Sequence, residues 1–172
     1  MPGLRKYELS FFTATILEWK HLLADDNYKN IILSSLSFLV SNGRVYVNAF
    51  AIMSNHMHLL WHIRHPFTKE DVQRDFLKYT GQMILKDLRG NNTEMLQQLQ
   101  VNAKDRKYQV WERNALTIPV WTENVLLQKL EYIHNNPVKA GLCMNAADYT
   151  YSSASFYNSG KDHFGFLSHY AY

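Results

Sequence analysis

Residues 45–63 read VYVNAFAIMSNHMHLLWHI, two short runs rich in β-branched, aromatic and apolar side chains. The runs cover Val45–Ile52 and His56–Ile63, and the polar break between them predicts an antiparallel hairpin. Because side chains alternate along a strand, the second run has one apolar face and one face that carries histidines. The expected histidine face comprises His56, His58, Leu60 and His62.

The segments on either side of this hairpin predict a strand and two helices. Residues 7–16 are rich in Phe, Thr and Tyr and predict a first strand. Residues 28–40 carry apolar side chains at helical spacing, and Asn42 with the following glycine ends that helix. Residues 68–90 predict a second long helix, with Thr68 as its N-cap.

The C-terminal half predicts smaller elements and one more helix. A short helix is expected over 94–100 and a strand over 108–111. A last helix begins after the N-cap Thr122 and is expected to end at Pro137. The residues after it, about 143–172, form an aromatic tail that is expected to pack back over the sheet.

This mixture of strands and helices predicts an α+β fold, an antiparallel sheet with helices on one face. The chain has 172 residues, of which 47% are hydrophobic, which suits a single domain spanning residues 1–172.

Composition excludes some protein classes but does not identify a partner. No apolar run is long enough to span a bilayer, so no membrane partner is expected. The N-terminus has no export signal, and the single cysteine, Cys143, permits no internal disulfide. Together these features predict a cytoplasmic location. The formal charge of +3 is compatible with nucleic acid but is shared by many metabolic enzymes.

Two patterns are typical of chemical sites. His56 and His58 lie two residues apart on one strand face, so both imidazoles can bind one metal ion. Taken alone, the pair also fits ordinary half-buried strand residues. On the last helix, Lys129, Tyr132 and Asn136 share one face, so a phenol nucleophile can lie beside an amide ligand. That face also fits a tyrosine packed under the tail and an asparagine ending the helix.

The two patterns and their flanks together resemble the single-tyrosine HUH transposases. The motifs are His56-Met57-His58-Leu59-Leu60-Trp61 and residues 132–142, YIHNNPVKAGL. The resemblance extends upstream to residues 48–55 and downstream to residues 149–154. It is strongest to the REP-associated tyrosine transposases, with their IS200-like domain.

The resemblance implies a ferredoxin-like sheet and a metal-dependent enzyme that nicks and rejoins single-stranded DNA, with a hairpin as the expected substrate. By the same resemblance, His56, His58 and Asn136 would bind Mg²⁺ or Mn²⁺. Tyr132 would attack the DNA and form a 5′-phosphotyrosine. Related insertion-sequence transposases have glutamine as the third ligand, where this chain has Asn136 like the REP-associated branch.

Several residues around this site have two interpretations. Lys129 could supply electrostatic support to Tyr132. The basic cluster of Lys104, Arg106 and Lys107 could contact the DNA backbone or form a solvated loop. We expect core positions rather than base-stacking roles for Trp61, Trp111 and Trp121, and no ligand role for His62 and His134.

Two other functions remain open from the sequence. One is a regulatory protein of the same fold that binds single-stranded DNA hairpins without cutting them. The other is a small metallohydrolase in which the histidine pair activates water. The chain could act as a monomer or a homodimer, so Tyr132 could serve its own histidine pair or that of a partner.

Overall fold

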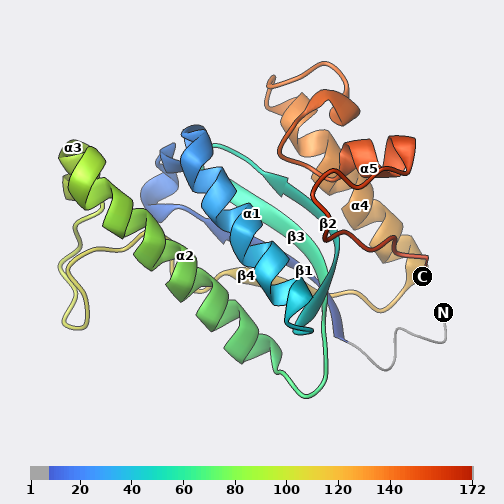
Figure 1. Cartoon of the computed structure of the whole chain (residues 1–172), viewed down its shortest axis with the longest axis horizontal. Coiled ribbons are helices and arrows are strands. Elements are labelled where there is room, and N and C mark those ends of the chain that lie inside the picture. The colour runs from blue at the N-terminus through green and yellow to red at the C-terminus, as the bar shows by residue number, and fades with distance from the viewer. Residues whose placement is uncertain (1–7, 172) are drawn as a thin grey trace.

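A four-stranded antiparallel sheet lies at the centre of the computed structural model, which describes residues 8–171. The strands are β1 (Glu8–Thr15), β2 (Val45–Ile52), β3 (His56–Ile63) and β4 (Leu116–Pro119), in the spatial order β2-β3-β1-β4. Figure 1 shows two long helices in front of the sheet, α1 (Asp26–Ser41) and α2 (Lys69–Asn91). This β-α-β-β-α-β succession gives the expected ferredoxin-like topology and confirms the α+β class.

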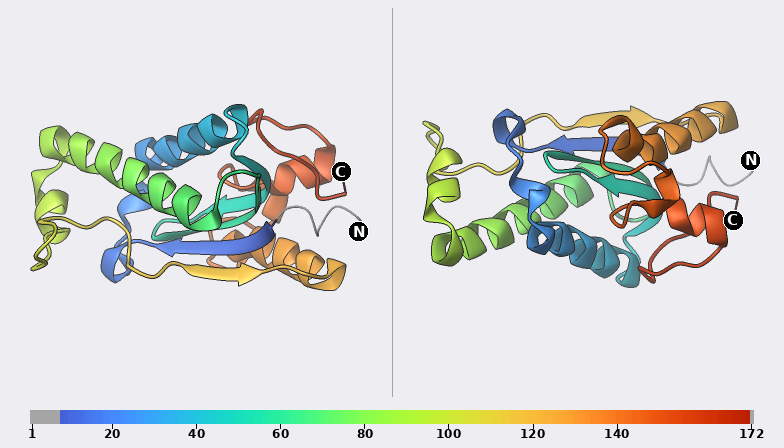
Figure 2. Two further views of the ribbon diagram at one scale, coloured as in Figure 1. Left: turned by 90° about the horizontal axis from the view of Figure 1, so that it is seen from below. Right: turned by 90° about the horizontal axis from the view of Figure 1, so that it is seen from above.

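The helices are not all on one face of the sheet. One face packs on α1 and α2 through side chains such as Phe12 and Trp61. The other face packs on α4 (Glu123–Lys139), with Leu60 beside Leu126 and Ile133 of that helix. Figure 2 shows α1 and α2 together on one side and α4 on the other. The expectation that all helices cover one face is therefore wrong. Helices α1 and α2 share one face, but the apolar stripe of α4 packs against the other.

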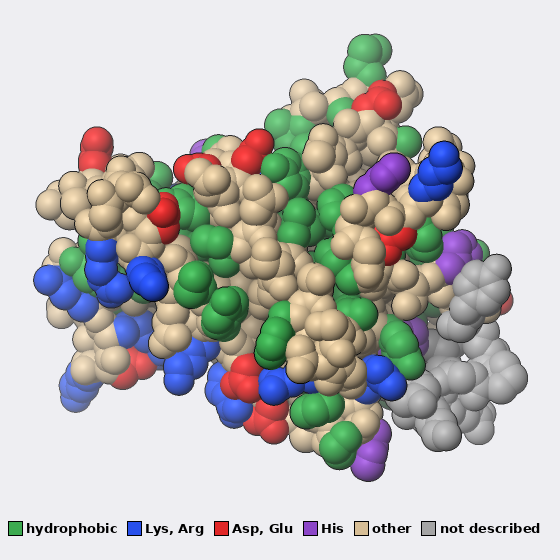
Figure 3. Space-filling model, viewed as in Figure 1, with side chains coloured by type: hydrophobic (Ala, Val, Ile, Leu, Met, Phe, Trp, Pro, Cys, Tyr) green, Lys and Arg blue, Asp and Glu red, His purple; other side chains and the backbone are tan. Residues whose placement is uncertain are grey.

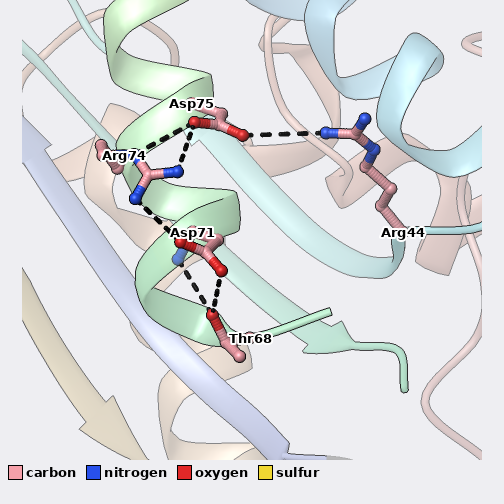
Figure 4. A network of polar contacts seen from close by, with 5 residues as sticks. All are labelled: Arg44, Thr68, Asp71, Arg74 and Asp75. Carbon is pink, nitrogen blue, oxygen red and sulfur yellow. Dashed lines mark hydrogen bonds and ion pairs between the residues drawn. The ribbon is translucent and has the colours of Figure 1, made fainter. Parts of the chain in front are cut away.

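The N-terminus of α2 is fixed by a polar network (Figure 4). As expected, Thr68 is the N-cap, and its hydroxyl accepts a hydrogen bond from the Asp71 backbone N–H at 3.2 Å. Arg74 pairs with Asp71 at 2.8 Å and with Asp75 at 3.0 Å. Asp75 also approaches Arg44, which follows α1, at 3.9 Å. The network joins the start of α2 to the end of α1.

Two expectations from the sequence, a strand over 108–111 and a helix end at Pro137, are wrong. Residues 108–111 form no strand, because Tyr108 and Trp111 make only isolated bridges while Trp111 packs in the core. The fourth strand is instead Leu116–Pro119, a half-exposed edge strand with no apolar run to indicate it. Pro137 does not end α4, which continues to Lys139. A proline in the last turn removes only its own N–H from the helix, and few hydrogen bonds follow it there.

The segment after α4 covers the outer edge of β2. It contains the short helices η3 (Ala146–Asp148) and α5 (Ala154–Ser159). Ser152 forms a bridge with Ala51, and Leu167 forms one with Val47. The tail thus packs against the sheet and covers an edge that would otherwise expose unpaired backbone groups. In the described residues 8–171, no helix has the length and apolar character needed to cross a bilayer.

Between residue 8 and β4, the structure has three further short helices. They are η1 (Leu17–Trp19) and η2 (Leu22–Ala24), between β1 and α1, and α3 (Thr93–Gln98), which overlaps the short helix expected over 94–100.

Candidate metal and nucleophile site

The histidine face of β3 lies beneath α4. His56 and His58 stand on the same side of the strand as Leu60, which packs against α4. Their rings are 4.8 Å apart between centroids, with an interplanar angle of 74°. The alternation expected from the sequence therefore places both imidazoles on one face of the strand, and the edge of one ring faces the plane of the other.

Neighbouring polar groups set the tautomer of each histidine. The Asn55 Oδ1 atom only accepts hydrogen bonds, so the His56 Nδ1 atom, at 2.7 Å, must donate. Asn136 Nδ2 only donates, so His58 Nε2, at 3.1 Å, must accept. The proton of His58 is then on Nδ1, which donates to the Thr13 hydroxyl at 2.7 Å. Each ring keeps an Nε2 lone pair, the arrangement that metal-binding histidines need.

Helix α4 brings Tyr132 and Asn136 to this pair. The Tyr132 ring is 5.3 Å from the His58 ring and 5.9 Å from Phe11, while 44% of the tyrosine is exposed. Lys129, one turn earlier, places its ammonium 4.8 Å from the Phe11 ring centroid and 6.0 Å from that of Tyr132. A phenol, an amide and an ammonium group from one helix thus lie against the histidine strand.

Burial keeps both imidazoles neutral near pH 7. It lowers the pKa of His58 to about 3, with further repulsion from His56 and Lys129. It also lowers the pKa of His56, although a hydrogen bond with Asn136 acts in the opposite direction. Neutral imidazoles are the form that binds metal ions, so the site is ready for a cation without losing protons.

The donor set fits a divalent cation held by His56, His58 and Asn136. In residues 8–171, no cluster of three or more His, Cys, Asp and Glu side chains could hold a metal ion, so a third protein ligand beside the two histidines would have to come from another residue type, such as the Asn136 amide, 3.1 Å from His58. The amide nitrogen of Asn136 faces His58, and a 180° rotation of the side-chain amide would place its oxygen there instead. Imidazole suits Mn²⁺ better than Mg²⁺, which prefers oxygen ligands.

The buried His58 and the partly buried His62 and His134 predict that the metal-free protein loses stability in mild acid. Burial lowers the pKa of His62 and His134 to about 4 each, and that of His58 to about 3. The unfolded chain takes up these protons below about pH 6.5, whereas the folded chain does not. The free energy of unfolding should therefore fall as pH decreases from about 6.5 towards 4, by up to about 1.4 kcal/mol per pH unit for each histidine.

Urea unfolding between about pH 7 and pH 5 in the presence of a chelator measures this slope. His134→Gln is the matched variant, because glutamine can keep the bond that His134 Nε2 makes with the Ser153 hydroxyl at 2.7 Å. This variant should take up about one proton fewer on unfolding, so its free energy of unfolding should depend less steeply on pH. A free energy of unfolding that stays constant over this pH range would contradict the prediction.

Similarity to known proteins is found in structure rather than in sequence. No family model and no curated protein matches the sequence. A solved REP-associated tyrosine transposase, bound to a REP hairpin, superposes with a TM-score of 0.66 at 15% identity, covering 94% of this chain and 86% of that chain. This chain has the fold of that transposase. A candidate transposase from Deinococcus radiodurans R1 also matches, with a TM-score of 0.47 and 14% identity over 75% of this chain and 91% of that chain. The resemblance seen in the sequence is confirmed at the level of the fold.

Within this REP-associated transposase fold, the basic cluster is remote from α4. Lys104, Arg106 and Lys107 are exposed on the segment between α3 and β4, at the opposite end of the molecule from α5 (Figure 1). Figure 3 shows Lys and Arg side chains gathered at that end. Arg106 is paired with Asp105 at 2.8 Å. The structure does not bring these residues together with the histidine pair.

The other candidates divide between core and surface. His62 Nδ1 is 2.8 Å from Asn48 Oδ1, and His134 is bound to Ser153, so each has a structural partner. Trp61 and Trp111 are buried as expected, whereas Trp121 is 71% exposed and is not a core residue. It lies between β4 and α4, where no strand alternation turns its side chain into the core.

The sequence did not point to four residues that line the site. Thr13 lies opposite His58 in the β1–β3 register, and Phe11 stacks on His58 at 5.4 Å. Asn55 and Trp19 both contact His56. Asn55 was detectable as the direct neighbour of His56, but Thr13, Phe11 and Trp19 come from a strand and a turn whose register the sequence does not show.

Proposed function

We propose that this chain is a metal-dependent DNA transposase that cuts and rejoins single-stranded DNA beside a hairpin through Tyr132. The observation that supports it most is the meeting of β3 and α4. The nucleophile candidate Tyr132 lies beside His58, and His58 accepts a hydrogen bond from Asn136 on the same helix as Tyr132. A hairpin substrate is proposed because the transposase of the same fold was solved bound to a REP hairpin.

In the proposed reaction, the phenol oxygen of Tyr132 attacks a backbone phosphorus and the bond from phosphorus to the 3′ oxygen breaks. The 5′ phosphate is then esterified to Tyr132, and the phenol proton is balanced by the proton that the 3′ hydroxyl gains. A 3′ hydroxyl of another strand reverses the step and joins the DNA. Because the ester keeps the energy of the broken bond, no ATP is needed.

The surrounding side chains would position the phosphate. The ammonium of Lys129 attracts the DNA strand to the exposed side of Tyr132, and Phe11 holds the Tyr132 and His58 rings at a fixed distance. Mg²⁺ or Mn²⁺ held by His56, His58 and Asn136 would supply Lewis acid stabilisation of charge on the phosphate oxygens.

The test uses hairpin DNA with single-stranded flanks, labelled at one end, and Mn²⁺. The 3′-labelled fragment should run with the protein in a denaturing gel, because Tyr132 holds its 5′ phosphate. The 5′-labelled fragment should be released with a 3′ hydroxyl that a polymerase can extend. Cleavage without a protein adduct would indicate a metallohydrolase instead, and binding without cleavage would indicate a regulatory hairpin-binding protein.

The remote basic cluster predicts a salt-dependent contribution to DNA binding. Replacing Lys104, Arg106 and Lys107 with alanine should weaken hairpin binding and reduce the slope of log affinity against log salt by about 0.7 to 0.9 for each DNA phosphate that these side chains neutralise. Titrations at several salt concentrations measure this slope. The charge-matched control replaces Lys78, Lys86 and Arg89, which are exposed on α2. Equal slopes for the two triple variants would contradict a specific role for the cluster.

A further inference from the structure

We propose that Trp19 is a stacking platform for one unpaired base of the DNA strand, next to the candidate cleavage site. This inference rests on the proposed function, because it describes how the strand is held there. Trp19 is 59% exposed, and the centroid of its ring lies 5.8 Å from that of His56 at an interplanar angle of 66°. Trp61 and Trp111, by contrast, are buried in the core.

The backbone that presents Trp19 is strained. Glu18 has φ 53° and Trp19 has φ 57°, so two consecutive residues with side chains occupy the left-handed region. Bulky residues seldom adopt this conformation, and such strain is concentrated at functional sites. The strain turns a large apolar side chain outwards beside His56, where packing alone would favour burying it.

Hydrogen bonds fix the N-terminal side of this strained turn. The Glu18 backbone N–H donates to the Glu112 carboxylate at 2.6 Å, and the Glu112 N–H donates to the Thr15 carbonyl at 2.7 Å. Just before the turn, the Ile16 N–H donates to the carbonyl of Asn55 at 2.9 Å. Asn55 also orients His56, so the indole and the candidate metal ligand are held by one rigid frame.

The chemistry of this surface suits a nucleobase. Every base has a π face, so an exposed indole binds unpaired bases with little sequence preference. Two carboxylates lie at the turn. Glu18 is paired with Lys20 at 2.8 Å, and Glu112 accepts the Glu18 backbone N–H at 2.6 Å, which limits their repulsion of phosphate. A base stacked on Trp19 would fix the adjoining backbone close to the histidine pair and Tyr132.

The test measures DNA binding without cleavage, in the Tyr132→Phe background with a chelator. The probes are a hairpin with single-stranded thymidine flanks and the same hairpin without flanks. Trp19→Leu should weaken binding of the flanked hairpin by roughly 5- to 100-fold and leave the unflanked one unchanged. Trp121→Leu is the matched control, because Trp121 is also exposed but follows Val120, whose N–H bonds to Leu9 at the other end of β1.

Fluorescence gives an independent readout, since base stacking quenches an indole. The flanked hairpin should quench the protein's tryptophan emission, and Trp19→Phe should remove that quenching while Trp121→Phe keeps it. Equal affinities of Trp19→Leu and its parent for the flanked hairpin would overturn the inference. So would weaker binding of Mn²⁺ alone by Trp19→Leu with unchanged DNA affinity, because Trp19 would then only orient His56.

The same reagents separate this inference from the proposed function. The covalent adduct is measured on the wild-type chain with Mn²⁺, whereas stacking is measured without metal or nucleophile. An adduct without a Trp19 effect on binding overturns the platform and leaves the transposase proposal intact. A Trp19 effect without any adduct supports the platform and contradicts the proposal of a cutting enzyme.

Discussion

Tyr132→Phe is expected to abolish both cleavage and the covalent adduct while DNA binding stays unchanged. Phenylalanine keeps the ring that contacts His58 and Phe11, so only the attacking oxygen is removed. Loss of a covalent nucleophile reduces turnover by several orders of magnitude, so the rate should fall by at least about 1,000-fold. Single-turnover cleavage of labelled hairpin DNA measures the rate, and a binding titration measures the affinity.

Tyr79→Phe is the matched control for this variant. Tyr79 is similarly exposed, at 52%, but it lies on α2, which covers the opposite face of the sheet. Its replacement should leave cleavage and adduct formation at the wild-type level. If Tyr132→Phe still formed the adduct, another residue would be the nucleophile and the proposed reaction would be wrong.

His58→Ala is expected to remove metal-dependent cleavage by weakening cation binding. Without the imidazole, the candidate site keeps only His56 and Asn136 as ligands. Since loss of an outer partner alone costs metal affinity about 10- to 100-fold, loss of a direct ligand should cost at least about 100-fold. Calorimetric titration with Mn²⁺ measures this affinity, and removing metal with a chelator should stop cleavage by the wild-type chain.

His58 is buried, with 4% exposed, so the substitution will also reduce stability. His62→Ala separates the two effects, because His62 stands on the same face of β3 and is bound to Asn48 rather than to the candidate site. It should lower the melting temperature yet keep Mn²⁺ affinity and cleavage per folded molecule. Equal losses of Mn²⁺ affinity in both variants would show that His58 is not a specific ligand.

Elements with a strong periodic pattern could be predicted from the sequence. The hairpin boundaries Val45–Ile52 and His56–Ile63 agree with β2 and β3, because both strands are apolar runs with a polar break between them. The N-caps Thr68 and Thr122 also agree, since each side chain accepts a backbone hydrogen bond from its helix. The edge strand Leu116–Pro119 could not be predicted, because it owes its conformation to pairing with β1.

The proximity of the candidate site residues could be predicted in part. Alternation in β3 placed His56 and His58 on one face of the strand, and helical spacing placed Tyr132 and Asn136 on one face of α4. The family resemblance predicted that these two faces meet. Which residues complete the site depends on tertiary contacts. Thr13 is opposite His58 only because of the β1–β3 register, and Trp19 reaches His56 only through a strained turn. Neither register nor backbone strain has a local sequence signal.

The position of the covalent bond tests the central claim most directly. The wild-type chain would be trapped with hairpin DNA and Mn²⁺, treated with nuclease and trypsin, and analysed by mass spectrometry. We predict a nucleotide attached through its 5′ phosphate to Tyr132, within the tryptic peptide of residues 130–139, LEYIHNNPVK. Strand cleavage with that peptide unmodified, or with the nucleotide on a different tyrosine, would contradict the account.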